Sequence, residues 1–262
     1  MNHLNAVVLD LEMTGLSPKT DKIIEIGALK VREGEIVGSF ERLLDPGRPL
    51  EPKTVEITGI TDEMLHDAPE FADICYELLE FLGEDILLGH NIIHDFSFLK
   101  RAVINVLPKK SSFERRGVDT LKIARGLLPA EQKKTLPALC AYYGILHQPH
   151  RASDDARATL LLYNALWQQF GEESPDKFLP RPLLYQVKRD TPVMPKQIAQ
   201  IERLLKEYHI EYAGDLTKMT KSEASRFIDR MKAAYGSSSG EQMDRKPDAE
   251  TEMSVKSAGQ NG

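Results

Sequence analysis

The hydrophobic pattern in the first part of the chain predicts strands before helices. Apolar runs at 5–11, 22–31 and 35–44 are typical of β-strands, and Gly34 indicates a hairpin between the second and the third. A shorter apolar run follows at 85–89. Strands that come first and are followed by a strand–helix alternation predict an α/β domain with a mixed sheet.

Helical periodicity dominates the region after the hairpin. The segment Asp67-Ala-Pro-Glu70 has the composition of a helix start, and Phe71, Ile74, Leu78 and Leu82 behind it have the spacing of one helical face. Helices therefore flank the predicted sheet. The same periodicity predicts further helices at 95–106, 119–128, 135–143 and 153–169.

The last third of the chain has a different composition. Five prolines without clear periodicity from Pro175 to Pro195 predict an ordered or semi-rigid linker. Two helices are predicted beyond it, one near 195–208 and one that opens with the capping-box sequence Thr220-Lys-Ser-Glu223. The chain after Tyr235 has few apolar residues and opens with Gly-Ser-Ser-Ser-Gly, which predicts disorder. The expected parts are a main domain at 1–174, a linker at 175–194, a helical module at 195–235 and a disordered tail at 236–262.

The composition narrows the class of protein. Hydrophobic residues make up 41% of the 262, enough for a packed core, and the two cysteines lie in apolar helical patterns, as expected of reduced thiols in a cytoplasmic protein. No signal peptide and no apolar run of membrane-spanning length is visible, so we expect no membrane contact. The net charge of −6 argues against a protein that coats duplex DNA. Acidic residues are in excess before the linker, and basic residues are in excess in the helical module.

Asp10 and Glu12 are the first residues whose spacing indicates chemistry. Residues two apart on a strand share a face, so both carboxylates project together while Leu11 points into the core. Neighbouring carboxylates repel each other unless a cation lies between them, and Mg²⁺ and Mn²⁺ prefer oxygen ligands. A solvated strand end has the same pattern, so the pair alone leaves both interpretations open.

Further acidic residues extend this pattern. Asp95 follows a short apolar strand at the start of a predicted helix, and Asp155 lies five residues after His150, one turn into the next helix. Each has a structural alternative. Asp95 could satisfy the free amides of its helix, and Ser153 or Asp154 could cap the later helix beside a surface histidine.

Taken together, these motifs resemble the DEDDh branch of the DEDD superfamily of 3′→5′ exonucleases. The matching segments are Asp10-Leu-Glu12-Met13-Thr14-Gly15, His90-Asn91 with Asp95 and Phe98-Leu99, and His150-x-Ala152-x-x-Asp155. A further segment, Val55-Glu-Ile-Thr58-Gly59-Ile60-Thr61, is similar to a loop of the proofreading epsilon-subunit exonucleases of bacterial replicative DNA polymerases. The resemblance covers about residues 5–170 and implies a ribonuclease H-like sheet.

The resemblance also implies which residues act. His150 would be the general base that takes a proton from the attacking water. The backbone amides of Thr14 and Gly15 would cradle the terminal nucleotide, and Asn91 would contact its sugar. The ligands of two divalent cations, Mg²⁺ or Mn²⁺, would be Asp10, Glu12, Asp95 and Asp155.

The implied substrate is the 3′ end of single-stranded DNA, and the implied partner is a DNA polymerase or repair protein. Met13 stands where the proofreading enzymes have Thr and makes the first motif similar to that of oligoribonuclease, and His94 replaces a Phe of the second. An RNA or oligoribonucleotide exonuclease therefore stays open. A non-catalytic nucleic-acid-binding or scaffold protein on this fold is the third alternative, against which the complete acidic set and His150 count.

Two pairs of histidines allow a different metal. His90 and His94 are four residues apart and His147 and His150 three, spacings that also occur in zinc sites. Because the carboxylates already account for the motifs, we expect His90 to be a structural hydrogen-bonding residue instead.

The helical module weakly resembles one appended to various bacterial and phage DNA-handling proteins. Its basic residues either contact a phosphate backbone or form the solvated faces of an amphipathic helix pair, and the sequence leaves both open. These residues are Lys196, Arg203, Lys218, Lys221, Arg226, Arg230 and Lys232.

Overall fold

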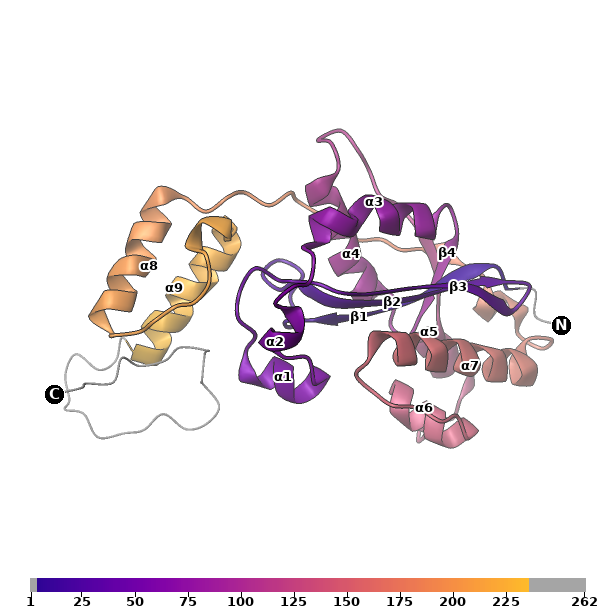
Figure 1. Ribbon diagram of the computed structural model, residues 1–262. Helices are drawn as coiled ribbons and strands as arrows, with labels where there is room; N and C mark the ends of the chain where they lie inside the picture. Colours follow the sequence, from indigo (N-terminus) through magenta and orange to yellow (C-terminus); the bar gives the residue numbers. More distant parts are fainter. Residues whose placement is uncertain (1–3, 236–262) are drawn as a thin grey trace.

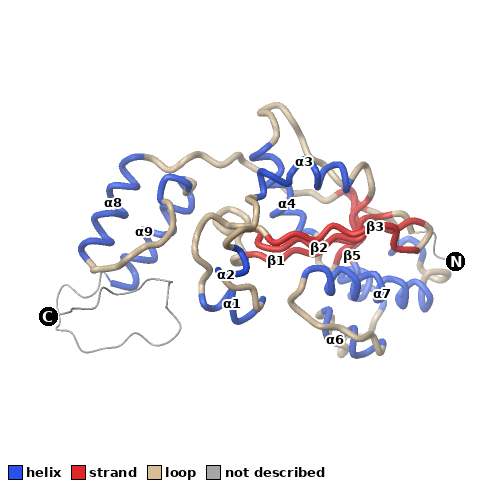
Figure 2. Tube along the Cα trace, in the orientation of Figure 1, coloured by secondary structure: helices blue, strands red, loops and turns tan. Residues whose placement is uncertain are grey.

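A six-stranded mixed sheet forms the centre of the protein (Figures 1 and 2). The structure is a computed structural model that describes residues 4–235, so the predicted disordered tail lies outside the described residues. The strand order across the sheet is β3-β2-β1-β4-β5-β6. The bounds are Ala6–Met13 for β1, Ile23–Arg32 for β2, Glu35–Leu43 for β3, Ile86–Gly89 for β4, Arg116–Asp119 for β5 and Arg181–Pro182 for β6.

Helices cover both faces of the sheet, which confirms the predicted ribonuclease H-like arrangement. Because side chains alternate along β1, Val7 and Leu9 join the core beneath α3 and α4, whereas Ala6 and Val8 join the core beneath α7. None of the helices within the described residues has the length and apolarity needed to cross a membrane. The bounds are Phe71–Leu82 for α3, Ile93–Val106 for α4, Thr120–Leu127 for α5, Leu136–Tyr143 for α6 and Ala152–Phe170 for α7.

β1 is a central strand, and its position decides where the polar side chains meet. It pairs antiparallel with β2 and parallel with β4, and β4 pairs parallel with β5. The C-terminal ends of β1, β4 and β5 therefore lie at one edge of the sheet. The β1–β2 register places Asp10 opposite Gly27 and Glu12 opposite Glu25 at that edge.

The helix α7 crosses β2 at unusually short range. A Cβ atom added to Gly27 would lie 2.1 Å from the carbonyl carbon of Ala152, at the first turn of α7. Glycine at this position and alanine at the start of α7 therefore let the helix backbone approach the strand. This contact brings Asp155 to the edge where Asp10 lies.

Some local structure differs from the sequence-based expectation. The segment expected to be a loop near Thr58 forms two short helices, α1 (Pro52–Thr58) and α2 (Asp62–Leu65), separated by Gly59 in a left-handed conformation with φ 68°. The strands β5 and β6 were not predicted, because runs of four and two residues are too short to show a period.

The proline-rich segment is ordered, and its first part packs on the main domain. It contains the short helix η1 (Pro175–Phe178) and the edge strand β6, which pairs with β5. Phe178 is buried in the core beneath α7, and Leu183 is buried in the core beneath α4. The predicted domain bounds stay a prediction, but the packing of the main core extends to Leu183.

The helical module has its own small core. It comprises α8 (Pro195–Glu207), the turn η2 (Leu216–Lys218) and α9 (Lys221–Tyr235). The capping box at the start of α9 is confirmed, because the Thr220 amide donates to the Glu223 carboxylate at 2.7 Å and the Glu223 amide donates to the Thr220 hydroxyl at 3.2 Å. The apolar faces of α8 and α9 meet at Ile201, Leu204, Ala224, Phe227, Ile228 and Met231.

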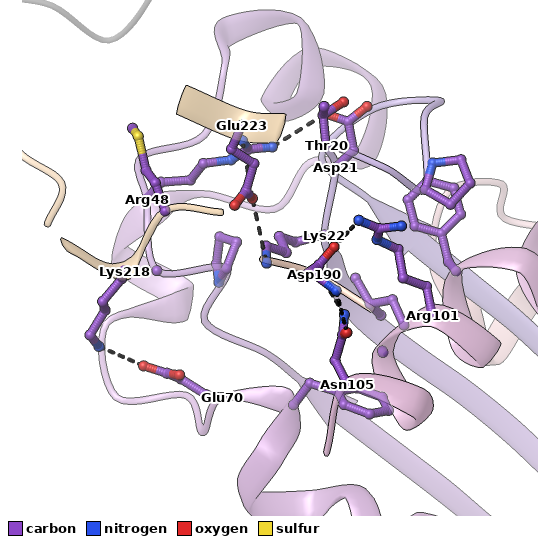
Figure 3. Close-up of a pocket in the computed structure, with 18 of the residues that line it drawn as sticks. Thr20, Asp21, Lys22, Arg48, Glu70, Arg101, Asn105, Asp190, Lys218 and Glu223 are labelled. Carbon is purple, nitrogen blue, oxygen red and sulfur yellow. Dashed lines mark hydrogen bonds and ion pairs between the residues drawn. The ribbon is translucent and has the colours of Figure 1, made fainter. Parts of the chain in front are cut away.

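Ion pairs dock this module against the main domain. Lys218 pairs with Glu70 at 2.6 Å, Arg226 with Asp21 at 3.1 Å, and Arg230 with Glu51. A cavity of about 220 Å³ lies in the seam, and Figure 3 shows Lys218 with Glu70 and Lys22 with Glu223 across it. Three of the basic residues considered for phosphate contact therefore already have carboxylate partners.

We predict that Gly27→Ala destabilises the protein, because the new methyl group has no space between β2 and α7. An overpacked site of this kind costs about 1–3 kcal/mol. Gly38→Ala in β3 is the matched control, since its Cβ would meet its nearest neighbour at 3.7 Å, an ordinary contact. Urea unfolding of both variants measures the difference. Equal stabilities would show that α7 does not depend on close approach to Gly27.

Candidate active site

Three carboxylates from two elements converge at the edge of the sheet. Asp10 and Glu12 project from β1 and Asp155 from the first turn of α7, and one oxygen of each lies within 4.8 Å of the others. Leu11 between the two strand carboxylates is buried, which confirms the predicted alternation. The three oxygens could share one cation.

Asp95 lies beside this group at the start of α4. It is buried, and its Oδ1 accepts a hydrogen bond from the Leu11 amide at 3.2 Å. This bond fixes the Asp95 carboxylate against β1. Its donor, Leu11, lies between Asp10 and Glu12 in the sequence. The charge of Asp95 raises the pKa of both Asp10 and Glu12, although burial is the larger cause for each.

A clamp on β2 holds α7 in place. The buried Glu25 accepts hydrogen bonds from the Arg151 guanidinium at 2.9 and 3.1 Å and from the Ala152 amide at 3.0 Å. These contacts join β2 to the N-terminus of α7. The two residues that make them lie four and three positions before Asp155. Arg151 is also the N-cap of α7, without a side-chain bond to the helix, so neither Ser153 nor Asp154 caps it.

The two histidines before α7 occupy different places. His147 is the imidazole that contacts the carboxylate group, through Nε2 to Oδ1 of Asp155. His150 contacts the same carboxylate through its backbone amide, at 2.9 Å from Oδ2, and it has a positive φ of 72°. His150 is an exposed residue of the loop before α7. The sequence pattern indicated His147 only as one of a histidine pair with zinc-like spacing, and not as a partner of Asp155.

Thr14 and Gly15 form the turn after β1. The Thr14 amide donates to the Lys22 carbonyl at 2.9 Å, and its hydroxyl accepts from the Lys22 amide and from Arg48. The Thr14 amide is therefore already bonded within the protein, and its contact with a nucleotide stays a prediction. A Cβ on Gly15 would lie 2.7 Å from the Asp21 carboxylate, so any larger residue there would displace that side chain.

The second motif is held by a network that uses its polar groups internally. His90 bonds through Nδ1 to Thr120 and through Nε2 to the Lys134 carbonyl, each at 2.9 Å. Asn91 has a positive φ of 67°, and its backbone amide donates to Oδ1 of Asp119 at 2.9 Å. Both His90 nitrogens are occupied, which confirms it as a structural residue. Within residues 4–235, the one cluster of metal-ligand type is carboxylate and not histidine, which disfavours zinc.

Comparison with known proteins identifies the family to which the residues of this site belong. The profile of the RNase_T exonuclease family matches residues 7–163, which include all four acidic positions and His150. The chain belongs to this exonuclease family. The DEDD resemblance seen in the motifs is thereby confirmed.

The curated relatives of this exonuclease are much longer proteins. DNA polymerase III PolC-type of Oceanobacillus iheyensis is 43% identical over 168 residues, which make up 64% of this chain and 12% of the relative. The protein of the same description from Bacillus subtilis is 43% identical over 157 residues, 60% of this chain and 11% of the relative. The chain thus spans only about an eighth of the length of the relatives it matches.

Solved structures of similar fold are also exonucleases. Exonuclease X in complex with 5′-overhanging duplex DNA has a TM-score of 0.50 at 27% identity, covering 63% of this chain and 93% of that one. Exonuclease I of E. coli in complex with a dT13 oligonucleotide has a TM-score of 0.54 at 18% identity, covering 66% and 42%. The second comparison supports the fold alone.

The electrostatics of the candidate site are dominated by crowded acids. Burial and the neighbouring Asp95, Asp155 and Glu12 hold the pKa of Asp10 well above its usual range. Burial, with repulsion from Asp155 and Glu25, raises the pKa of Glu12 to about 8, and burial raises that of Asp95. A divalent cation would reverse this repulsion, so the donor set fits hard cations that prefer oxygen.

We predict that the chelated protein loses stability as the pH rises from about 5 to about 8. Glu12 has an ordinary pKa near 4.5 in the unfolded chain and about 8 in the folded protein, so the folded state binds more protons between those values. The stabilisation is complete below the unfolded pKa and is lost as the pH rises through the folded pKa. Urea midpoints measured in EDTA across this range test the slope.

Asp10→Asn should flatten this decline, because it removes a second carboxyl group whose pKa is raised by folding. Added Mg²⁺ should restore stability at the upper end. Asp67→Asn, at a fully exposed aspartate, is the matched control and should leave the slope as it is. A slope that Asp10→Asn leaves untouched would mean that the acidic cluster does not govern the pH dependence.

Proposed function

We propose that this chain is a metal-dependent 3′→5′ exonuclease that releases nucleoside monophosphates from DNA 3′ ends in proofreading or repair. The observation that carries the proposal is the convergence of Asp10, Glu12 and Asp155 within 4.8 Å, in a chain of the exonuclease family. The buried Asp95 beside them completes the acidic set.

The four carboxylates would hold Mg²⁺ or Mn²⁺. Two such cations supply a nucleophilic water at neutral pH and stabilise the charge on the leaving 3′-oxygen. Asp10 and Glu12 present oxygens from a rigid strand, and the Glu25–Arg151 clamp fixes the helix that carries Asp155. The carboxylates are thus placed before substrate arrives, and they would hold the cations beside its phosphate.

His150 is the proposed general base. The backbone at His150 is anchored to Asp155 while its imidazole is exposed, so the side chain can reach a phosphodiester bound over the acids. His147 orients the Asp155 carboxylate through its own bond to Oδ1. Gly15 supplies a backbone amide for the terminal nucleotide, Thr14 shapes the turn around it, and Asn91 lies at the end of β4 for contact with the sugar.

DNA is the proposed substrate because of the relatives. The PolC-type DNA polymerases share 43% identity with this chain, and the exonuclease X structure holds a 5′-overhanging duplex DNA. A DNA polymerase or a repair protein is the matching proposal for a partner. Met13 and His94 are the features that favour the RNA or oligoribonucleotide alternative.

We predict that 5′-labelled single-stranded DNA incubated with the protein and Mg²⁺ or Mn²⁺ gives a ladder that shortens one nucleotide at a time from the 3′ end. EDTA should stop the reaction, and Asp155→Asn should abolish it while the protein stays folded. RNA of the same sequence is the comparison substrate. Faster removal from RNA would favour the oligoribonucleotide alternative, and full activity of Asp155→Asn would reject the metal site.

His150→Ala should lower turnover by roughly 10²–10⁴-fold, the usual contribution of a positioned acid–base group. The rate of the unmodified enzyme should rise with pH, because the base must be neutral to accept a proton, and the variant should lose most of that dependence. His147→Ala should retain the shape of the pH profile, and His66→Ala at an exposed site controls for loss of a histidine. If His147→Ala flattened the profile instead, His147 would be the base.

A further inference from the structure

An open groove of about 1010 Å³ lies between the main domain and the start of the helical module. It is bounded by α4, by the loop after α4, by the segment that leads to α8 and by the first turn of α9. In Figure 1 the segment that leads to α8 passes along the side of α4 before it reaches the module. The groove thus lies apart from the acidic cluster but shares α4 with it.

Cationic side chains dominate this groove in an otherwise acidic protein. Seven lysines and arginines line it against two acidic residues, whereas the whole chain has a net charge of −6. The neighbouring cavity in Figure 3 differs, because five acidic and five basic residues line it and balance each other. The neighbouring cavity therefore does not share the positive charge of the groove.

Most of this charge has no internal partner. Lys100 is held by both oxygens of Glu114 at 2.8 Å, and Arg101 pairs with Asp190, so the two acids neutralise two cations. The other five have no ion-pair partner within residues 4–235. They are Lys19, Lys109, Lys188, Arg189 and Lys221.

The walls of the groove are fixed in place. Asp190 is tied to α4 by hydrogen bonds with Asn105 and by the Arg101 pair, and Arg189 donates to the Pro108 carbonyl at 2.6 Å. Five hydroxyl side chains, four of Ser or Thr and one of Tyr, also line the groove and can donate to phosphate oxygens. A fixed row of unpaired cations and hydroxyl donors is suited to a chain of phosphates.

We propose that this groove binds the phosphate backbone of the DNA strand whose 3′ end occupies the acidic site. The inference rests on the proposed function and adds a second binding region to it. Two features connect the groove to the site. Lys19 lies on the turn that begins with Thr14, and its carbonyl accepts from Arg101 at 3.4 Å. The helix α4 carries Asp95 near its start and Ile104 in the groove.

The distance along α4 sets which part of the strand reaches the groove. Nine residues separate Asp95 from Ile104, which is about 14 Å at ~1.5 Å per residue. A single strand that keeps a stacked spacing of ~3.4 Å per phosphate would place phosphates in the groove from about the fourth nucleotide onward. Short oligonucleotides therefore bind without the groove, and long ones use it.

The test compares Lys109→Glu/Lys188→Glu with Lys122→Glu/Arg157→Glu, a control of equal charge change. Lys122 and Arg157 are exposed on α5 and α7, on the opposite face of the sheet. Full-length proteins are titrated in EDTA with labelled dT20 and dT3, and the ratio of the two affinities is the readout. Binding in EDTA needs no turnover, so this result is independent of whether the chain hydrolyses DNA.

At low salt, the ratio of dT20 affinity to dT3 affinity should be lower in the groove variant by on the order of tenfold. The slope of log dT20 affinity against log salt concentration should become shallower by about 1.4, which is about 0.7 for each of the two lost contacts. The control should keep both values. Equal ratios in the two variants would overturn the proposal. A poly-glutamate peptide of matched charge provides a second test. The proposal would also be overturned if this peptide bound the unmodified protein as tightly as dT20 and if the groove variant lost that binding, because the occupant would then be an acidic protein segment.

Discussion

Mutual repulsion among crowded carboxylates is the constraint on which this structure depends. Asp10, Glu12 and Asp155 present oxygens within 4.8 Å of one another, and Asp95 is bound to the same strand. Burial and repulsion raise the pKa of Glu12 to about 8, so the folded chain holds these groups at a cost that only protons or cations relieve. Such a cost is retained where the site requires a concentrated negative charge, as a site for divalent cations does.

The rest of the main domain opposes this repulsion. Apolar burial on both faces of β1 keeps the strand central, so its carboxylates cannot move apart by unpairing from the sheet. On the other side, Gly27 admits the first turn of α7, and Glu25 holds that turn through Arg151 and the Ala152 amide. Glu25 is itself an acid beside the cluster, but its charge is paired with a guanidinium. Close packing and one ion pair thus fix Asp155 against the charges it faces.

Much of this arrangement could be predicted from the sequence, because local patterns record it. An apolar run located β1, and the period of two along a strand placed Asp10 and Glu12 on a shared face. The five-residue spacing from His150 placed Asp155 one turn into α7. Contacts between distant residues leave no such pattern. Neither the Glu25–Arg151 pair nor the choice between His147 and His150 at Asp155 can be read from spacing, and the strands β5 and β6 are too short to show a period. The basic residues of the module gave a further ambiguity, since only the fold reveals that Arg226 faces Asp21.

The charge distribution divides the molecule into an acidic centre and a cationic groove along α4. The ion pairs that dock the module hold α9 beside the groove, so the module acts through its position as well as through its own charges. The central claim remains that the carboxylate cluster is a cation site. Titration of the full-length protein with Mn²⁺, followed by electron paramagnetic resonance in the presence of thymidine monophosphate, measures this directly. The account predicts about two bound ions per chain with the nucleotide, fewer without it, and loss of both in Asp10→Asn. Binding of Mn²⁺ that is unchanged in Asp10→Asn would contradict it.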